Sequence, residues 1–515
     1  MKDLMKEQKQ KLLLCFGSVF FWGLLAHGYG FLRCNLSHDA LNAFVATGVE
    51  EVWKLELGRF LVPVYRAVFR GSVTLPWLTG LLGLTWTAAA LVLISDLFRM
   101  ESRVLVFLTA GILTTNITYI AQIATYLYEY DCNALALLLS VAAVYLWCRG
   151  GVIPMLAGSL CVAASMGIYQ AYFAVAVTLM VWKSVMDLLD GDEARRVILR
   201  GLKGIGLLLA GGILYLLATK LVSAATGIQL QDRVNALKGF GENPVVFYLG
   251  LVKPAMKYLL TKLLHPAYQT PLAVCVGIVT VALVAAAIRV FWVKRYRLGR
   301  VALILLLVAL TPFAMTCVYF LSKGKDAHDL TIYALWLFYV FILLFAFRLC
   351  GKELLPGRAS RILRAVACIL VAVLLWQNVV LANTAYVKKE KEADADLSMM
   401  TRVVCMLEDR EDFVPGETVV AFIGTPETRP GLYGMERVCK IIGLSDHSIF
   451  ITDASKYYYN AYRAYFDYVL RYPVVFCTDA VRAELKQDPR VQTMPAYPQE
   501  GYMAMIDGIL VIKMG

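Results

Sequence analysis

Apolar stretches that are long enough to cross a bilayer recur along the chain from residue 11 to residue 383. A helix of about 20 apolar residues covers the hydrocarbon of a membrane, which is roughly 30 Å thick. The pattern therefore predicts a polytopic α-helical membrane protein with about eleven transmembrane helices. We place them at residues 11–31, 75–98, 104–122, 133–148, 152–168, 171–188, 204–224, 271–293, 301–321, 330–349 and 363–383.

The pattern changes after Asn383. A charged run at Lys388–Asp396 is followed by short apolar stretches that alternate with helix-like segments, as in a small α/β domain. The strand-length stretches are Thr418–Ile423, Val474–Phe476 and Gly508–Met514, and the helix-like segments are Asp453–Leu470 and Ala480–Leu485. We therefore expect a membrane domain over residues 1–383 and an α/β domain over residues 384–515.

Composition and charge support this division. The chain is 59% hydrophobic and only 17% charged, and its net charge is +12. The Lys and Arg residues gather in short clusters before the first predicted helix and after the second, fourth, sixth, eighth and tenth. This is the positive-inside pattern of membrane proteins, so we expect a cytoplasmic N-terminus and membrane lipids, not nucleic acid, around the chain. An odd number of spans then places the α/β domain on the extracytoplasmic side.

Two loops on the predicted external side are long. Residues 32–74 include apolar positions at helical spacing, such as Phe44, Val52 and Phe60, and residues 225–270 include lysines at helical spacing. We expect both loops to contain amphipathic helices that lie in the membrane interface.

Polar side chains that could take part in catalysis or binding also gather on the predicted external side. They are His38, Asp39, Glu51, Arg59, Tyr128, Glu129, Asp131, Tyr169, Gln170, Lys323, Lys325 and His328. Each has a simpler alternative reading: Asp39 and Asp131 as helix caps, Arg59 as a snorkelling side chain, Tyr169 as part of an aromatic belt.

Together these residues suggest an aqueous pocket that handles a phosphorylated sugar. A carboxylate can deprotonate an acceptor hydroxyl, and a guanidinium can hold a departing phosphate by two hydrogen bonds. Nucleotide sugars are cytoplasmic, so an external pocket needs a donor that arrives through the membrane, such as a polyprenyl-phosphate sugar. The twelve cysteines and the histidines show no metal-ligand spacing, so we expect no structural metal. A loosely held Mg²⁺ or Mn²⁺ between a carboxylate and the phosphate requires no such ligand spacing, so the sequence leaves the presence of such an ion open.

The order of these motifs resembles the type II O-antigen glucosyltransferase (Gtr) family of bacterial membrane proteins, in the GT-C class. The shared motifs are His38-Asp39, Gly58-Arg59-Phe60, Tyr128 to Asp131, Gly167 to Ala171, and a tail with Met494-Pro495, Tyr497-Pro498, Gly501 and Lys513. The chain departs from the family where His38 stands in place of a second acid, and where Lys323 and Lys325 stand in place of an arginine.

The resemblance implies an inverting transferase in the bacterial cytoplasmic membrane. It would move a hexose, glucose by analogy, from undecaprenyl phosphate to an extracytoplasmic polysaccharide or lipid-linked glycan. Asp39 would be the general base and Asp131 the second acid. The donor phosphate would contact Arg59, Lys323 and Lys325. The sugar or acceptor would contact His38, Glu51, Tyr128, Glu129, Tyr169, Gln170 and His328.

The main alternative is a transporter or flippase for a lipid-linked glycan. Such proteins have broken helices or acids near the membrane midplane and often two related halves. Here the charges lie at helix ends and no internal repeat is visible, which favours a transferase. A third possibility, a noncatalytic scaffold, leaves Asp39 and Arg59 without a shared purpose.

Overall fold

The fold is that of a computed structural model, which describes residues 2–33, 37–45, 48–231, 244–324, 327–350, 357–426, 429–445, 448–450 and 456–515. Within these residues, eight helices are long and apolar enough to cross a membrane. They are α1 (Lys2–Leu32), α5 (Pro76–Leu97), α8 (Tyr130–Arg149), α10 (Phe173–Asp190), α11 (Ala194–Thr226), α13 (Thr270–Lys294), α14 (Leu298–Met315) and α17 (Gly357–Glu408).

The remaining predicted spans are also helical. One is a broken helix, α6 (Arg103–Thr115) and α7 (Ile117–Thr125), which bends by 41°. The other two are shorter apolar helices, α9 (Val152–Ile168) and α16 (Tyr333–Cys350). The polytopic helical fold is therefore confirmed, with eight or nine full-length candidate spans among the described residues.

Asn116 explains the break between α6 and α7. Its side-chain amide nitrogen donates to the carbonyl groups of Ile112 and Leu113, both at 3.0 Å, and its oxygen accepts from the backbone N–H of Tyr119 at 3.1 Å. One side chain thus satisfies backbone groups at the end of one helix and the start of the next. The bend is capped on both sides, although it lies in an apolar run.

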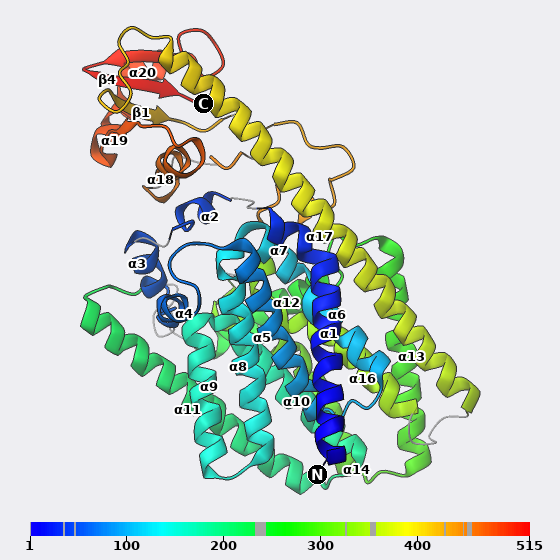
Figure 1. The fold of residues 1–515 in the computed structure, drawn as a ribbon. Coiled ribbons are helices and arrows are strands. Elements are labelled where there is room, and N and C mark those ends of the chain that lie inside the picture. Colours follow the sequence, from blue (N-terminus) through cyan, green and yellow to red (C-terminus); the bar gives the residue numbers. More distant parts are fainter. Residues whose placement is uncertain are drawn as a thin grey trace.

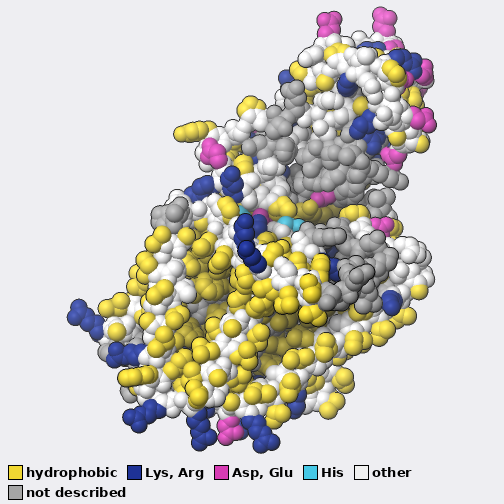
Figure 2. All heavy atoms as spheres, turned by 180° about the vertical axis from the view of Figure 1, so that it is seen from behind, with side chains coloured by type: hydrophobic (Ala, Val, Ile, Leu, Met, Phe, Trp, Pro, Cys, Tyr) yellow, Lys and Arg dark blue, Asp and Glu magenta, His cyan; other side chains and the backbone are white. Residues whose placement is uncertain are grey.

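The surface of the bundle is that of a membrane protein. Hydrophobic side chains cover the helical body in Figure 2, and Lys and Arg gather at the end opposite the C-terminal domain. Large apolar side chains of α11 and α13 are more than half exposed, including Leu209 and Trp292. Contiguous exposed apolar surface of this extent needs lipid around it.

Helices from the two long loops cover the other end of the bundle, which we call the domain end because the C-terminal domain lies over it (Figure 1). They are α2 (His38–Asn42), α3 (Gly48–Glu56), α4 (Leu61–Phe69) and α12 (Pro244–Leu263). Both long loops thus contain helices, as expected, and their depth in the membrane interface stays a prediction.

The helix α17 joins the bundle to the C-terminal domain. It is 52 residues long and continues without interruption through the predicted boundary at residues 383 and 384. It leads into a mixed four-stranded sheet of order β2-β1-β4-β3, in which only β3 and β4 are antiparallel. The strands are β1 (Val419–Ile423), β2 (Val475–Phe476), β3 (Met503–Ile506) and β4 (Ile509–Lys513).

Short helices complete the C-terminal domain. They are α18 (Lys456–Tyr465) with η5 (Phe466–Leu470), α19 (Asp479–Gln487) and α20 (Pro489–Thr493). Val420, Phe422, Leu510 and Ile512 of the central strands are fully buried. The predicted small α/β domain is confirmed.

Candidate functional site

Two motifs that lie far apart in the sequence pack against each other at the domain end. Gly58 has a φ of +69°, which turns the chain between α3 and α4. A Cβ atom at Gly167 would lie only 2.8 Å from Cζ of Phe60, so glycine there admits the phenyl ring. The amide of Gln170 donates to the Leu57 carbonyl at 2.7 Å. The glycines of both motifs therefore permit this close approach.

This packing fixes the position of Arg59. Its guanidinium lies 4.3 Å from the centre of the Tyr169 ring, and its Nη1 lies 3.4 Å from Oε2 of Glu129. Burial alone would lower the pKa of Arg59, but Glu129 together with the neighbouring tyrosines more than offsets it, and the pKa is raised. A permanently charged, oriented guanidinium results.

Arg59 lies at the wall of a cavity of about 620 Å³. Polar lining residues include Arg59, Tyr169, Gln170, His328 and Thr331. Apolar lining residues include Ile205, Leu208, Leu209, Ile213 and Leu216 of α11, and Val318 and Leu321. From Ile205 to Leu216 the α11 wall is roughly 16 Å long at 1.5 Å per residue. The cavity therefore combines a polar group of side chains with a long apolar wall, which suits an amphiphile.

A buried ionic network surrounds Arg59. Lys54 contacts both Glu50, at 3.1 Å, and Glu129, and Arg66 donates to Glu50 at 3.1 Å. Burial would raise the pKa of Glu50, but Lys54 and Arg66 hold it below its usual value. The network thus consists of ionised groups that tie α3 and α4 to the turn before α8.

Asp131, predicted as the second acid, lies in the same region but does not line the cavity. It is fully buried, and it accepts hydrogen bonds from Arg70 Nε at 2.8 Å and from the backbone N–H of Cys132 at 2.9 Å. Tyr128 is also buried, with Lys54 Nζ 5.2 Å from its ring centre. These contacts favour a structural role for Asp131, Tyr128 and Glu129.

Asp39 is placed differently. It lies in the first turn of α2 and is partly exposed, and Tyr126 donates its hydroxyl hydrogen to Oδ2 at 2.5 Å. The N-cap of α2 is Ser37, whose Oγ accepts from the N–H of Ala40 at 3.1 Å, so Asp39 is not needed as a cap. Neither Asp39 nor Tyr126 lines the cavity, but Tyr126 lies within electrostatic range of Arg59, which does.

The C-terminal domain contacts the helix that carries Asp39. Leu41 is fully buried in the hydrophobic core of that domain, and the rings of Phe44 and Tyr468 lie 5.4 Å apart. Any molecule that reaches Asp39 therefore approaches beside this domain.

The other predicted site residues are less closely connected. Glu51 is exposed, whereas its neighbour Glu50 belongs to the network. Lys323 lies in the turn after α15 (Cys317–Leu321), next to the cavity residue Ser322. His38 begins α2, but its side chain lies outside the described residues, and so does Lys325.

Several residues of the network were not selected from the sequence. They are Glu50, Lys54, Arg66, Arg70 and Tyr126. The spacing of four between Glu50 and Lys54 places this pair on one face of α3 and could have indicated it. Among the described residues, no group of three or more His, Cys, Asp or Glu side chains is arranged to hold a metal ion.

The described residues thus define a multi-pass helical membrane protein with a cavity whose lining suits an amphiphile. The family model described as glucosyl transferase GtrII matches residues 28–347, and the chain belongs to this family. The match extends across the predicted site residues from His38 to His328 and ends before the C-terminal domain. No curated protein and no solved structure matches the chain. Membership in the family implies an enzyme that transfers a glucosyl group from a sugar donor to a glycan and so modifies O-antigen.

Proposed function

We propose that this glucosyltransferase is an inverting enzyme of the GT-C class whose donor is glucose linked to a polyprenyl phosphate, undecaprenyl phosphate in a bacterial membrane. The acceptor is an extracytoplasmic cell-envelope polysaccharide or lipid-linked glycan. The observation that carries this proposal is the cavity: Arg59 lies at its polar part, and an apolar wall of α11 follows in the direction of the membrane.

The polyprenyl chain would lie along the α11 wall, with its phosphate at the Arg59 guanidinium. Leu209 and Ile213 line the cavity and are themselves more than half exposed on the bundle surface, so a lipid can enter from the side. Lys323, and Lys325 from outside the described residues, would add positive charge near the phosphate. Tyr169, Gln170 and His328 would contact the sugar.

In the reaction, the carboxylate of Asp39 accepts the proton of an acceptor hydroxyl as its oxygen attacks C1 of glucose. The bond between C1 and the phosphate oxygen breaks, and the phosphate leaves with the electron pair on the opposite face of the sugar. Arg59 stabilises the negative charge on the leaving phosphate by charge-assisted hydrogen bonds. Attack from the opposite face inverts the configuration at C1.

The orientation follows from charge. Lys and Arg gather at the end opposite the C-terminal domain, and positively charged loops lie on the cytoplasmic side of membrane proteins (Figure 2). Asp39, the cavity entrance and residues 384–515 would then be extracytoplasmic. Because the C-terminal domain packs against α2, we assign it to recognition of the acceptor.

A transporter remains a second candidate because α6 and α7 form a broken helix, a feature of transporter sites. However, the polar atoms of Asn116 at this break are bonded to the backbones of the two helices. Helix capping therefore explains the break without a transported substrate.

The proposal is tested with purified protein, a polyprenyl-phosphate-glucose donor and an O-antigen acceptor. We expect release of polyprenyl phosphate and a product whose glucose has the opposite anomeric configuration, determined by NMR. Retained configuration, or direct use of a nucleotide sugar, would contradict the mechanism. Exposed Cys405, which follows Asn383 on α17, reports on orientation: labelling only from the cytoplasmic side would overturn the topology.

A further inference from the structure

One segment of the C-terminal domain is inserted into the domain end of the bundle. Val438, Ile441 and Leu444 are buried in the same hydrophobic core as the transmembrane helices. Gly443 has a φ of +76°, and a Cβ atom there would lie 2.6 Å from Cγ2 of Thr125 in α7. Residues 435–444, which we call the docking segment, therefore pack directly onto the bundle.

Asp329 joins the docking segment to the helices around it. Its Oδ2 accepts the backbone N–H of Ile442 at 2.9 Å. Its Oδ1 accepts from Lys262 Nζ of α12 at 2.6 Å and lies 3.2 Å from His265 Nε2. Its own carbonyl accepts from Thr118 Oγ1 of α7 at 2.8 Å. One buried residue thus connects four separate parts of the chain.

Asp329 is ionised although it is buried. Only 1% of the residue is exposed. Burial would raise its pKa, but the hydrogen bonds and charges of His265 and Lys262 more than offset this and lower the pKa to about 2. A buried ionised carboxylate of this kind holds its partners in fixed positions, because an unpaired one is costly.

Asp329 also adjoins the cavity. It begins the short helix η3 (Asp329–Thr331), and both His328, which precedes η3, and Thr331, which ends it, line the cavity. The backbone N–H of His328 donates to Thr331 Oγ1 at 3.1 Å, so the two lining residues move as one unit with η3. Displacement of Asp329 would therefore displace this part of the cavity wall.

We infer that Asp329 is a positioning residue that couples docking of residues 435–444 of the C-terminal domain to binding of the lipid-linked donor in the cavity. The inference rests on the proposed function, since it takes the cavity as the donor site. When the docking segment is in place, the N–H of Ile442 holds Asp329, and Asp329 holds the wall that contains His328 and Thr331. The catalytic pocket is thus complete only when the C-terminal domain is docked.

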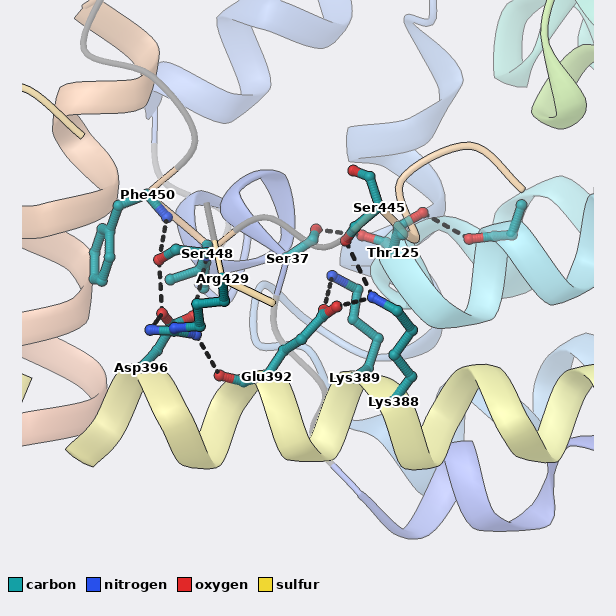
Figure 3. A network of polar contacts seen from close by, with 12 residues as sticks. Ser37, Thr125, Lys388, Lys389, Glu392, Asp396, Arg429, Ser445, Ser448 and Phe450 are labelled. Carbon is teal, nitrogen blue, oxygen red and sulfur yellow. Dashed lines mark hydrogen bonds and ion pairs between the residues drawn. The ribbon is translucent and has the colours of Figure 1, made fainter. Parts of the chain in front are cut away.

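Asp396 of α17, which binds residues before and after the docking segment, offers a matched control (Figure 3). Asp396 of α17 accepts hydrogen bonds from Arg429 Nη2 and Ser448 Oγ, both at 2.6 Å, and from the backbone N–H of Ile449 at 3.0 Å. Like Asp329, it is a buried carboxylate that accepts a backbone N–H of the C-terminal domain, but it does not line the cavity or adjoin a residue that does.

The experiment uses the reciprocity of coupling: if docking favours donor binding, donor binding must favour docking by the same factor. Half-buried Cys439 of the docking segment reports on docking, through its rate of modification by a maleimide, measured by peptide-resolved mass spectrometry. Exposed Cys405 on α17 is the internal reference. The full-length protein is labelled with and without saturating short-chain polyprenyl-phosphate-glucose, and the dissociation constant of this donor is measured separately.

In the wild type we expect the donor to slow modification of Cys439 but not of Cys405. Asp329→Asn should speed modification of Cys439, weaken donor binding about fivefold or more, and abolish the effect of the donor on labelling. Asp396→Asn should leave donor binding unchanged. Equal loss of donor binding in both variants would overturn the inference, as would donor binding without slower labelling in the wild type. The wild-type comparison needs no variant to fold. A wild type that binds no donor at all contradicts the proposed function as well.

Discussion

Tyr126 donates a hydrogen bond to Asp39 over 2.5 Å, and so joins α2 to the turn that precedes α8. Burial and the neighbouring Asp39 carboxylate raise the pKa of Tyr126 well above its usual value, so the tyrosine stays a neutral donor. The carboxylate is thereby held in one orientation while it remains partly exposed.

Asp39→Asn should therefore remove the general base and little else. Loss of a general base lowers turnover by about 100- to 10,000-fold. Donor affinity and the melting temperature should stay near the wild-type values. Steady-state kinetics with polyprenyl-phosphate-glucose measure the turnover, and thermal unfolding in detergent measures the melting temperature. Retained turnover would place the base on another residue. Tyr126→Phe, which keeps the carboxylate, should reduce turnover much less.

Arg59→Ala should weaken donor binding. A hydrogen bond to a charged group contributes about 1.5–3 kcal/mol, so we expect a dissociation constant roughly 10- to 150-fold higher. Arg59→Lys should recover part of the loss, because lysine retains the charge without the planar fork. Arg149, which lies 5.0 Å above the Tyr145 ring at the last turn of α8, is the control. Equal effects of Arg59→Ala and Arg149→Ala would contradict phosphate binding by Arg59.

Asp131→Asn should destabilise the fold and leave the chemistry of the folded fraction intact. Removal of one partner from a buried ion pair costs about 3–5 kcal/mol, because the other charge, here Arg70, stays buried without compensation. Thermal unfolding should show a lower midpoint, and kcat per folded molecule should be close to that of the wild type. An unchanged midpoint with lost turnover would instead identify Asp131 as a catalytic acid.

Gly212→Phe should block the apolar wall of the cavity. Gly212 lines the cavity, and a Cβ atom placed there would have no other atom within 4 Å, so a larger side chain can begin there without a clash. We expect a long-chain donor to bind at least about tenfold more weakly, a difference of ~1.4 kcal/mol. Gly206→Phe is the matched control, since Gly206 lies on the same helix with equally open space but does not line the cavity. Unchanged donor binding in Gly212→Phe would exclude this wall as the lipid site.

Hydrophobic length was sufficient to predict the bundle, because a span must be apolar for its whole length. It could not predict the break at Asn116, since one polar side chain changes the run little, while its three hydrogen bonds to backbone groups end one helix and begin the next. The predicted boundary at residue 383 is not marked by a break in the structure, because the charged residues after it, such as Lys388 and Glu392, pair along the same continuous helix.

The sequence could predict the site residues that belong to recognisable motifs. Arg59, Tyr169, Gln170 and His328 do line one cavity. The role of Asp131 depends on Arg70, a partner 61 residues away that is brought close only when α4 packs beside the start of α8. The spacing of residues along the sequence does not predict that packing. The same holds for Glu50 and Glu51, adjacent acids of which only one faces the network.

The uninterrupted helix α17 has a consequence for which acceptors can be used. Its 52 residues correspond to roughly 78 Å at 1.5 Å per residue, more than twice the hydrocarbon thickness of a bilayer. Because the helix is continuous, its C-terminal end, where the sheet domain begins, is held well above the bundle. If this domain binds the acceptor, as proposed, the enzyme would modify only sugar units within a set distance of the membrane surface, whatever the total length of the polysaccharide.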